Sequence, residues 1–278
     1  MKKISRRSFL AAAAVSVAAL AMTACGGSAS SAASSVASSA ASSEAVSSAA
    51  AAELTTVEAG KLTMATNAAF PPYEMTTDAG EFEGIDIDTA KAIAEKLGLE
   101  LQIDDMDFDA ALLSVQQGKA DIVMAGVTVT DERKAVMDFS DSYATGIQSI
   151  IVPEGSDITS PDDLAGKKIG TQRGTTGYIY CSDDFGDDAV VAYDDGLTAV
   201  QALKNGQVDA VVIDNAPAQE FVAANPGLVI LDTSYAEEDY AIGLAKGSAL
   251  EDAVNAALEE LKADGTLQSI VDKYITAE

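Results

Sequence analysis

An arginine that opens a short helical segment is the first residue with the chemistry of a binding site. Arg133 follows an apolar stretch at residues 122–125 and a polar segment that ends at Thr130. Thr130 suits a helix N-cap, whereas a cation in the first helical turn opposes the helix dipole. An arginine fork beside unpaired backbone N–H groups can hold a carboxylate. The alternative is a surface ion pair with a neighbouring acid, namely Asp131, Glu132 or Asp138.

A carboxylate at the end of another apolar strand offers the complementary chemistry. Residues 210–213 are apolar, and Asp214 follows them directly. Its carboxylate can accept hydrogen bonds from an ammonium group, or it can cap a helix that begins near Ala216. If Arg133 and Asp214 lie on opposing sides of one cleft, they recognise the two charged ends of a zwitterion.

The composition excludes several other kinds of site. The chain has no histidine, which removes the commonest general base and the commonest zinc ligand. Its net charge of −27 repels nucleic acid, so we expect no nucleic-acid partner. The acidic residues are scattered without the spacing of a calcium loop, and we expect neither a metal nor another cofactor.

The first part of the chain has the features of an exported lipoprotein. Residues 1–24 combine a basic start, an apolar run and small residues, as in a signal peptide. Residues 22–26 resemble a lipobox, in which Cys25 would carry the lipid; an ordinary cleavage site beside a chance cysteine is the alternative. Arg6 and Arg7 fit a twin-arginine signal and a general secretion signal equally. Residues 25–53 are mostly Ser and Ala, which predicts a flexible tether.

The remainder predicts two α/β lobes built from a repeated unit. Strands near residues 61–66, 99–103, 122–125 and 210–213 alternate with helices near 87–97, 110–117, 249–261 and 267–274, without hairpin signals. This order predicts two parallel-rich sheets. Residues 115–123 are echoed by residues 203–211, each with a glycine, two residues and an aspartate before an apolar strand. We expect one lobe at 54–145 plus 241–278 and the other at 146–240.

The folded part, about residues 58–276, resembles the bacterial extracellular solute-binding proteins of family 3, the receptors of ATP-powered importers for polar amino acids. The resemblance is carried by an ordered set of motifs at residues 65–74, 84–88, 106–108, 125–133, 139–143 and 208–214. It implies a two-lobed fold of the type II periplasmic-binding-protein kind with a two-strand hinge, near residues 143–147 and 238–242. It also implies that the protein is a monomer with an importer permease as its partner. Lipid on Cys25 would be its only attachment to the outer face of the cell membrane.

The resemblance assigns roles to individual side chains. Arg133 would bind the ligand carboxylate and Asp214 the ammonium group. Phe70 and Phe108 would form aromatic walls, or they could belong to the core. The other implied ligand-binding residues are Asn67, Ala125, Gly126, Thr128, Gln172, Thr175 and Thr176. By the same resemblance, Asp86 and Asp88 would cap the helix at 87–97.

The ligand class follows from two of these positions. Several relatives carry Asp where this chain has Asn67, and Gln172 favours hydrogen bonding over charge pairing. We therefore expect a polar L-amino acid, neutral slightly ahead of cationic. Two rival functions are open: an enzyme of the cyclohexadienyl dehydratase kind on the same scaffold, and a soluble sensor domain. A dehydratase without histidine would need a carboxylate as its general acid or base, so we expect no enzyme.

Overall fold

The computed structural model describes residues 54–275. The predicted signal peptide, the lipidation site at Cys25 and the tether up to residue 53 lie outside these residues, as do residues 276–278. In the described part, no helix is long and apolar enough to cross a membrane. Its strands form two large sheets and one small sheet.

The first large sheet has the strand order β5-β1-β6-β14-β7 and an apolar core on each face. Its strands are β1 (Lys61–Thr66), β5 (Glu100–Asp105), β6 (Ile122–Val123), β7 (Met137–Phe139) and β14 (Gly243–Ala245). Successive side chains of a strand point to opposite faces. Met64 and Ile122 therefore pack with helices α1 (Ile85–Leu97), α7 (Glu251–Ala263) and α8 (Thr266–Tyr274). Ala65 and Val123 pack with α2 (Phe108–Gln116) on the other face.

The second large sheet has the order β10-β9-β11-β8-β12, and β13 also pairs with β8. Its strands are β8 (Ala144–Pro153), β9 (Ile169–Gln172), β10 (Val190–Tyr193), β11 (Ala210–Asp214), β12 (Leu228–Ile230) and β13 (Ala236–Tyr240). Val211 and Ile213 pack against α5 (Gly196–Lys204) and α6 (Asn215–Ala224). Val212 packs on the opposite face with α4 (Thr176–Phe185) and the 3-10 turn Pro161–Leu164.

The expectation of parallel-rich sheets without hairpins is wrong in detail, because both large sheets are mixed. β1 is parallel to β5 and β6, but β14 runs antiparallel to β6 and β7. β9 is parallel to β10 and β11, whereas β8 is antiparallel to β11, β12 and β13. A small antiparallel sheet joins β2 (Ala69–Phe70), β3 (Glu74–Thr76) and β4 (Phe82–Glu83). The turn between β2 and β3 contains Pro71 and Pro72, which are joined by a cis peptide bond. Its sequence lacks the Asn-Gly pair by which a hairpin can be recognised from sequence.

The repeated sequence unit forms the same local structure in both sheets. Gly118 and Gly206 follow α2 and α5 with φ of 66° and 68°, a conformation that favours glycine. Three residues later, Asp121 accepts a hydrogen bond from the Thr63 N–H at 2.8 Å, and Asp209 accepts one from the Lys168 N–H at 2.8 Å. Each aspartate thereby ties the start of its strand to the neighbouring strand.

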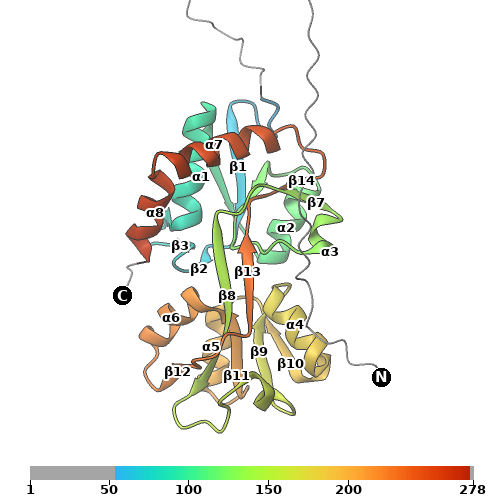
Figure 1. The fold of residues 1–278 in the computed structure, drawn as a ribbon, viewed down its shortest axis with the longest axis vertical. Coiled ribbons are helices and arrows are strands. Elements are labelled where there is room, and N and C mark those ends of the chain that lie inside the picture. The colour runs from blue at the N-terminus through green and yellow to red at the C-terminus, as the bar shows by residue number, and fades with distance from the viewer. Residues whose placement is uncertain (1–53, 276–278) are drawn as a thin grey trace, which may run out of the picture. The chain divides into compact units, whose positions relative to one another are not determined.

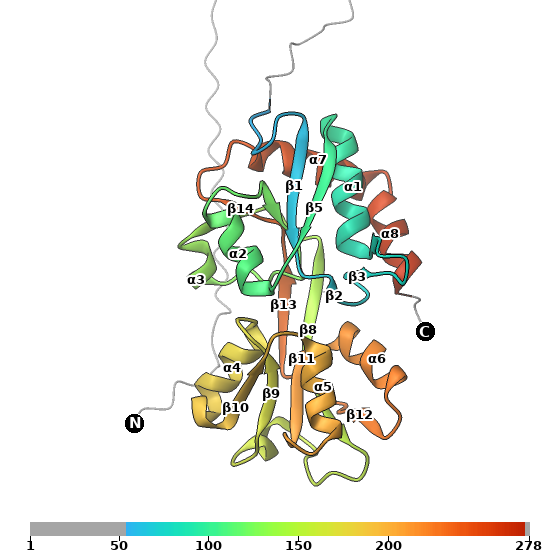
Figure 2. The same ribbon diagram turned by 180° about the vertical axis from the view of Figure 1, so that it is seen from behind.

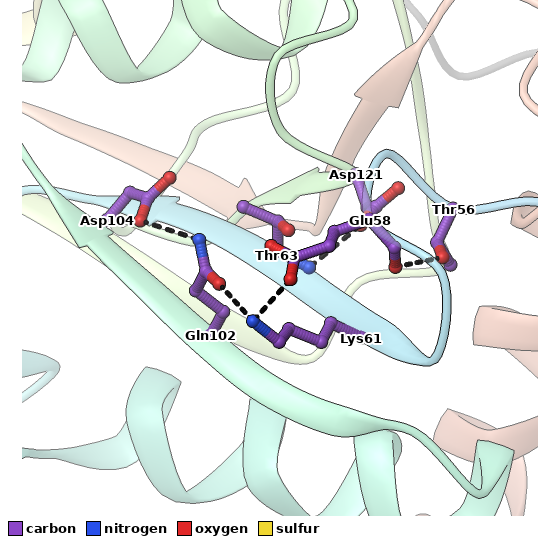
Figure 3. A network of polar contacts seen from close by, with 7 residues as sticks. All are labelled: Thr56, Glu58, Lys61, Thr63, Gln102, Asp104 and Asp121. Carbon is purple, nitrogen blue, oxygen red and sulfur yellow. Dashed lines mark hydrogen bonds and ion pairs between the residues drawn. The ribbon is translucent and has the colours of Figure 1, made fainter.

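The first copy of this unit also holds the start of the described chain. Asp121 accepts a second hydrogen bond from the Val57 N–H at 2.7 Å. Lys61 contacts Glu58 and Gln102 close by, at 2.5 Å and 3.1 Å. Figure 3 shows this network beside β1. The segment that leads into the folded part is thus anchored on the first sheet.

Two strands carry the chain between the first and second sheets. Figures 1 and 2 show β8 and β13 side by side in the region between the two sheets. They pair antiparallel from Ala144 with Tyr240 to Gln148 with Ala236. The end of β13 also pairs with the segment after β6, since Thr128 and Tyr240 form an isolated bridge. A bend at residues 143–147 and 238–242, and the lobe boundaries drawn there, stay predictions.

The predicted caps of α1 are wrong. The N-cap of α1 is Gly84, and no side chain bonds the helix terminus. Asp86 turns inward and accepts a hydrogen bond from the Gly126 N–H at 3.0 Å. Asp88 accepts hydrogen bonds from Lys273 and Tyr274 of α8, at 2.7 Å and 2.8 Å. The first N–H groups of α1 are bonded instead by backbone carbonyls, since Ile85 donates to Pro72 at 3.0 Å and Asp86 to Tyr73 at 2.8 Å.

Candidate ligand-binding site

One cavity lies where the carboxyl ends of strands from both large sheets converge. The space between its walls is about 400 Å³, part of it open to solvent. All eleven residues expected to bind ligand line it, joined by Glu74, Gln148, Ile213 and Tyr240. From the first sheet come Asn67 after β1, Phe108 after β5 and the segment after β6. From the second come Gln172 at the end of β9 and Asp214 at the end of β11.

Arg133 is buried in the wall of this cavity and links the two sides. It lies in the short helix α3 (Asp131–Lys134), where Thr130 caps the helix as expected and accepts a hydrogen bond from the Arg133 N–H. One guanidinium nitrogen donates to the carbonyl of Thr128 at 2.8 Å. The other donates to the carbonyl of Gly174, across the cavity, at 3.2 Å. The guanidinium carbon lies 5.4 Å from the centre of the Phe108 ring.

No carboxylate in the described residues forms an ion pair with Arg133. Of the acids considered from the sequence, Asp138 pairs instead with Lys246. Burial lowers the pKa of Arg133, while the charge of Glu238 acts in the opposite direction. A buried guanidinium held only by neutral carbonyls has unused capacity to bind an anion.

Asp214 caps a helix, which is one of the two roles considered for it. Its Oδ1 accepts a hydrogen bond from the Ala216 N–H at 3.1 Å, which caps α6. Its Oδ2 accepts from the Ile147 N–H and the Tyr240 hydroxyl, both at 2.8 Å. Burial raises its pKa to about 6, against these hydrogen bonds. A nearby cation would relieve that cost of burial, so the group is suited to receive an ammonium.

Two amides meet across the cavity at a different place from Arg133. Gln172 donates from Nε2 to Asn67 Oδ1 at 2.9 Å and to the carbonyl of Asp194 at 3.3 Å. Asn67 in turn donates to the carbonyl of Met106 at 2.9 Å. Phe108 belongs to a core cluster, while Phe70 packs against cores of both sheets, so each ring is partly wall and partly core.

A cluster around Glu238 closes the cavity behind Thr128 and Thr176. Glu238 is buried on β13, and its Oε2 accepts hydrogen bonds from both threonine hydroxyls and from Gln148 Nε2, each at 3.0 Å. Its Oε1 has no hydrogen-bond partner in the described residues. Because Thr128 and Thr176 come from opposite sides, this carboxylate joins them.

A second pair of acids lies beneath the Ala125–Gly126 segment. Glu74 and Asp86 are fully buried, and burial raises the pKa of Asp86 to about 6. Burial, and then the charge of Asp86, raises the pKa of Glu74 well above its ordinary value. Asp86 uses the N–H of Gly126, whose φ is 54°. Because the Gly126 N–H donates to Asp86, the backbone group of Gly126 that can contact a ligand is its carbonyl.

Sequence reasoning missed Glu238, Glu74, Gln148 and Tyr240. Glu238 stands in an acidic run, Glu237 to Asp239, that reads as solvated surface. The alternation of Glu238 with Tyr240 and Ile242 is the signal that could have found it, because residues two apart share a strand face. In residues 54–275, no group of three or more metal-binding side chains is present.

Comparisons with known proteins agree with this architecture. The family model for bacterial extracellular solute-binding proteins, family 3, matches residues 62–277. A probable histidine-binding protein of Neisseria gonorrhoeae is 33% identical over 275 residues, which cover 96% of this chain and 95% of the relative. An ABC transporter glutamine-binding protein of Bacillus subtilis is 35% identical over 202 residues, covering 71% and 74%. A solved ancestral arginine-binding protein bound to arginine has a TM-score of 0.74 at 44% identity, covering 78% of this chain and 98% of that one.

The mixed sheets, the two crossing strands and the cavity between them define a type II periplasmic-binding-protein fold. The chain belongs to the bacterial extracellular solute-binding proteins, family 3.

Proposed function

We propose that the protein binds a polar L-amino acid outside the cytoplasm and delivers it to an ABC importer. The observation that carries this proposal is the placement of Arg133 and Asp214, from different sheets, around one cavity. Neither has a partner of opposite charge within ion-pair distance in the described residues. A zwitterion supplies both missing charges at once.

The contacts suggest how each end of the ligand is held. Arg133 binds the carboxylate, since the Thr128 hydroxyl already donates to Glu238, and Asp214 with the Gly126 carbonyl binds the ammonium group. The side chain then lies between Phe70 and Phe108, towards Asn67 and Gln172. Apolar rings beside a few convergent polar groups suit a small polar ligand.

Binding is coupled to closure of the two lobes. Each sheet alone provides about half of the contacts, so the ligand binds the closed form more tightly and shifts the population towards it. The importer permease would recognise the closed form. We infer that the protein acts as a binder and not as an enzyme or sensor, since the relatives above are named as binding proteins.

Calorimetry against the common L-amino acids tests the proposed function. We expect one or a few of them to bind with micromolar or tighter affinity, since the cavity offers partners for both charged ends. Absence of heat with every amino acid, from protein shown to be folded by circular dichroism, would contradict the proposal.

We further propose that lipid on Cys25 anchors the protein to the outer face of the cell membrane, as a lipoprotein. Cys25→Ser removes the acceptor sulfur, and we expect the protein to appear in the soluble extracytoplasmic fraction without incorporating labelled palmitate. Cys181→Ser is the matched control, because that thiol is buried in the second sheet's core and burial raises its pKa to about 12. Continued membrane association of Cys25→Ser would refute the anchor.

A further inference from the structure

The buried charges around the cavity do not balance. Among residues 54–275, Arg133 is the only buried cation. The buried carboxylates of Glu74 and Asp214 line the cavity with it. Those of Glu238 and Asp86 lie behind the lining, where they accept hydrogen bonds from Thr128 and from the Gly126 N–H. The buried side chains in and behind the lining therefore include an excess of carboxylates over cations.

A neutral amino acid does not change this excess. Its carboxylate matches Arg133 and its ammonium matches Asp214, so the net charge that it adds is zero. An amino acid with a cationic side chain adds one positive charge. Interactions between charges are stronger in a closed, partly desolvated site than in water, so this difference affects affinity.

Among the buried carboxylates, Glu238 exerts the largest effect of a single charge on Arg133. Three donors, the hydroxyls of Thr128 and Thr176 and the amide of Gln148, converge on its Oε2. It lies behind Thr128 and Thr176 and acts on Arg133 through its charge. The other charged or titratable groups that affect this region are Asp214 on β11, Tyr240 on its own strand, Tyr180 on α4 and Asp109 on α2.

We propose that Glu238 is a specificity-determining residue that makes the cavity prefer amino acids with a positively charged side chain over neutral ones. This inference rests on the proposed function and replaces the neutral preference that Asn67 and Gln172 suggest, because Glu238 adds a negative charge from another strand. The side-chain end of the cavity fits such a ligand. Gln172 uses its amide N–H groups on Asn67 and Asp194, which leaves its carbonyl oxygen as an acceptor for ligand N–H groups. A flat cation also suits the faces of Phe70 and Phe108.

Arginine and citrulline provide a matched pair of probes, since citrulline replaces the guanidinium by a neutral urea of similar shape. We expect the wild type to prefer arginine by at least about tenfold, the size of an interaction between unit charges several ångströms apart in a partly buried site. Glu238→Gln keeps the shape and an acceptor for the threonines, and should lower the ratio of the two affinities by roughly tenfold. Glu237→Gln is the control: it removes the same charge from the exposed neighbouring position and should leave the ratio unchanged.

The ratio separates a charge effect from a structural one, because a general loss of packing weakens both ligands alike. An unchanged ratio in Glu238→Gln, or an equal change in Glu237→Gln, overturns the proposal.

If Glu238→Gln does not fold, measurements on the wild type at different salt concentrations decide. A tenfold preference that persists between about 0.05 M and about 0.5 M salt supports a buried charge, since surface charges are screened; equal binding of the two ligands, or loss of the preference in salt, overturns it. Binding of neutral amino acids only would also overturn this inference but not the proposed function, whereas binding of no amino acid would contradict the proposed function itself.

Discussion

Replacing Arg133 with alanine is expected to weaken amino-acid binding by about 3–5 kcal/mol, which is more than a hundredfold in affinity. The ligand carboxylate would be buried against Thr128 and Phe108 without its cation. The empty protein should lose little stability, because Arg133 there is a desolvated charge without a carboxylate partner in the described residues. Calorimetry and thermal unfolding of the same sample measure the two effects.

Arg173 is the matched control for Arg133. It lies on the loop after β9, on the opposite side of the cavity, and its side chain is 56% exposed in an ion pair with Asp194. Arg173→Ala removes the same group from the rim, where screening by solvent makes ion pairs weak. We expect it to change affinity by less than about 1 kcal/mol. Equal losses in the two variants would mean that Arg133 acts only through the overall charge of the cleft.

The elements that local chemistry determines were predicted well from the sequence. β1 occupies residues 61–66 as expected, and α1 ends at Leu97, before Gly98 in the left-handed conformation. Apolar periodicity and helix-stopping glycines are local signals, so one sequence is enough to find them. The repeated glycine–aspartate unit is likewise local, and it has the same structure in both sheets.

The elements that depend on partners distant in sequence have no local signal, and a strand near residues 238–242 was expected only through the family resemblance. β13 is an acidic run that becomes a strand only because it pairs with β8, about ninety residues earlier in the chain. The direction of β8 and β14, antiparallel to their neighbours, is equally invisible in local patterns. The resemblance assigned Asp86 to the cap of α1, but its contact with Gly126 in the folded chain gives it a different role.

The candidate site shows the same division. Arg133 and Asp214 stand at the ends of apolar strands, where open α/β sheets place ligands, so their position could be reasoned out. Glu238 could not, because its importance comes from Thr128 and Thr176 meeting it from different sheets. A residue such as Glu238, whose role depends on contacts with residues distant in sequence, has no local sequence pattern that marks it.

Replacing Asp214 with asparagine is expected to weaken amino-acid binding by about 2–4 kcal/mol and to remove most of its pH dependence between pH 5 and pH 7.5. In the wild type, burial raises the pKa of Asp214 to about 6, so the carboxylate is ionised above this pH and neutral below it. The ammonium needs the ionised form. Wild-type affinity should therefore fall as the pH drops through 6, by up to about tenfold per pH unit. Calorimetry across this range measures both proteins.

A second group could give the same profile, which makes the variant essential. Asp86 also has a pKa of about 6, and it holds the Gly126 segment of the cavity wall. If Asp86 controls binding, the decline at low pH will persist in Asp214→Asn. If Asp214 controls binding, the variant will bind the amino acid weakly at every pH. The variant will also bind a deaminated analogue of the ligand at least as well as the wild type does. In the wild type, this analogue would leave the ionised carboxylate of Asp214 buried without a cation. A wild-type affinity that stays constant from pH 7.5 to pH 5 would exclude Asp214 as the partner of the ammonium group.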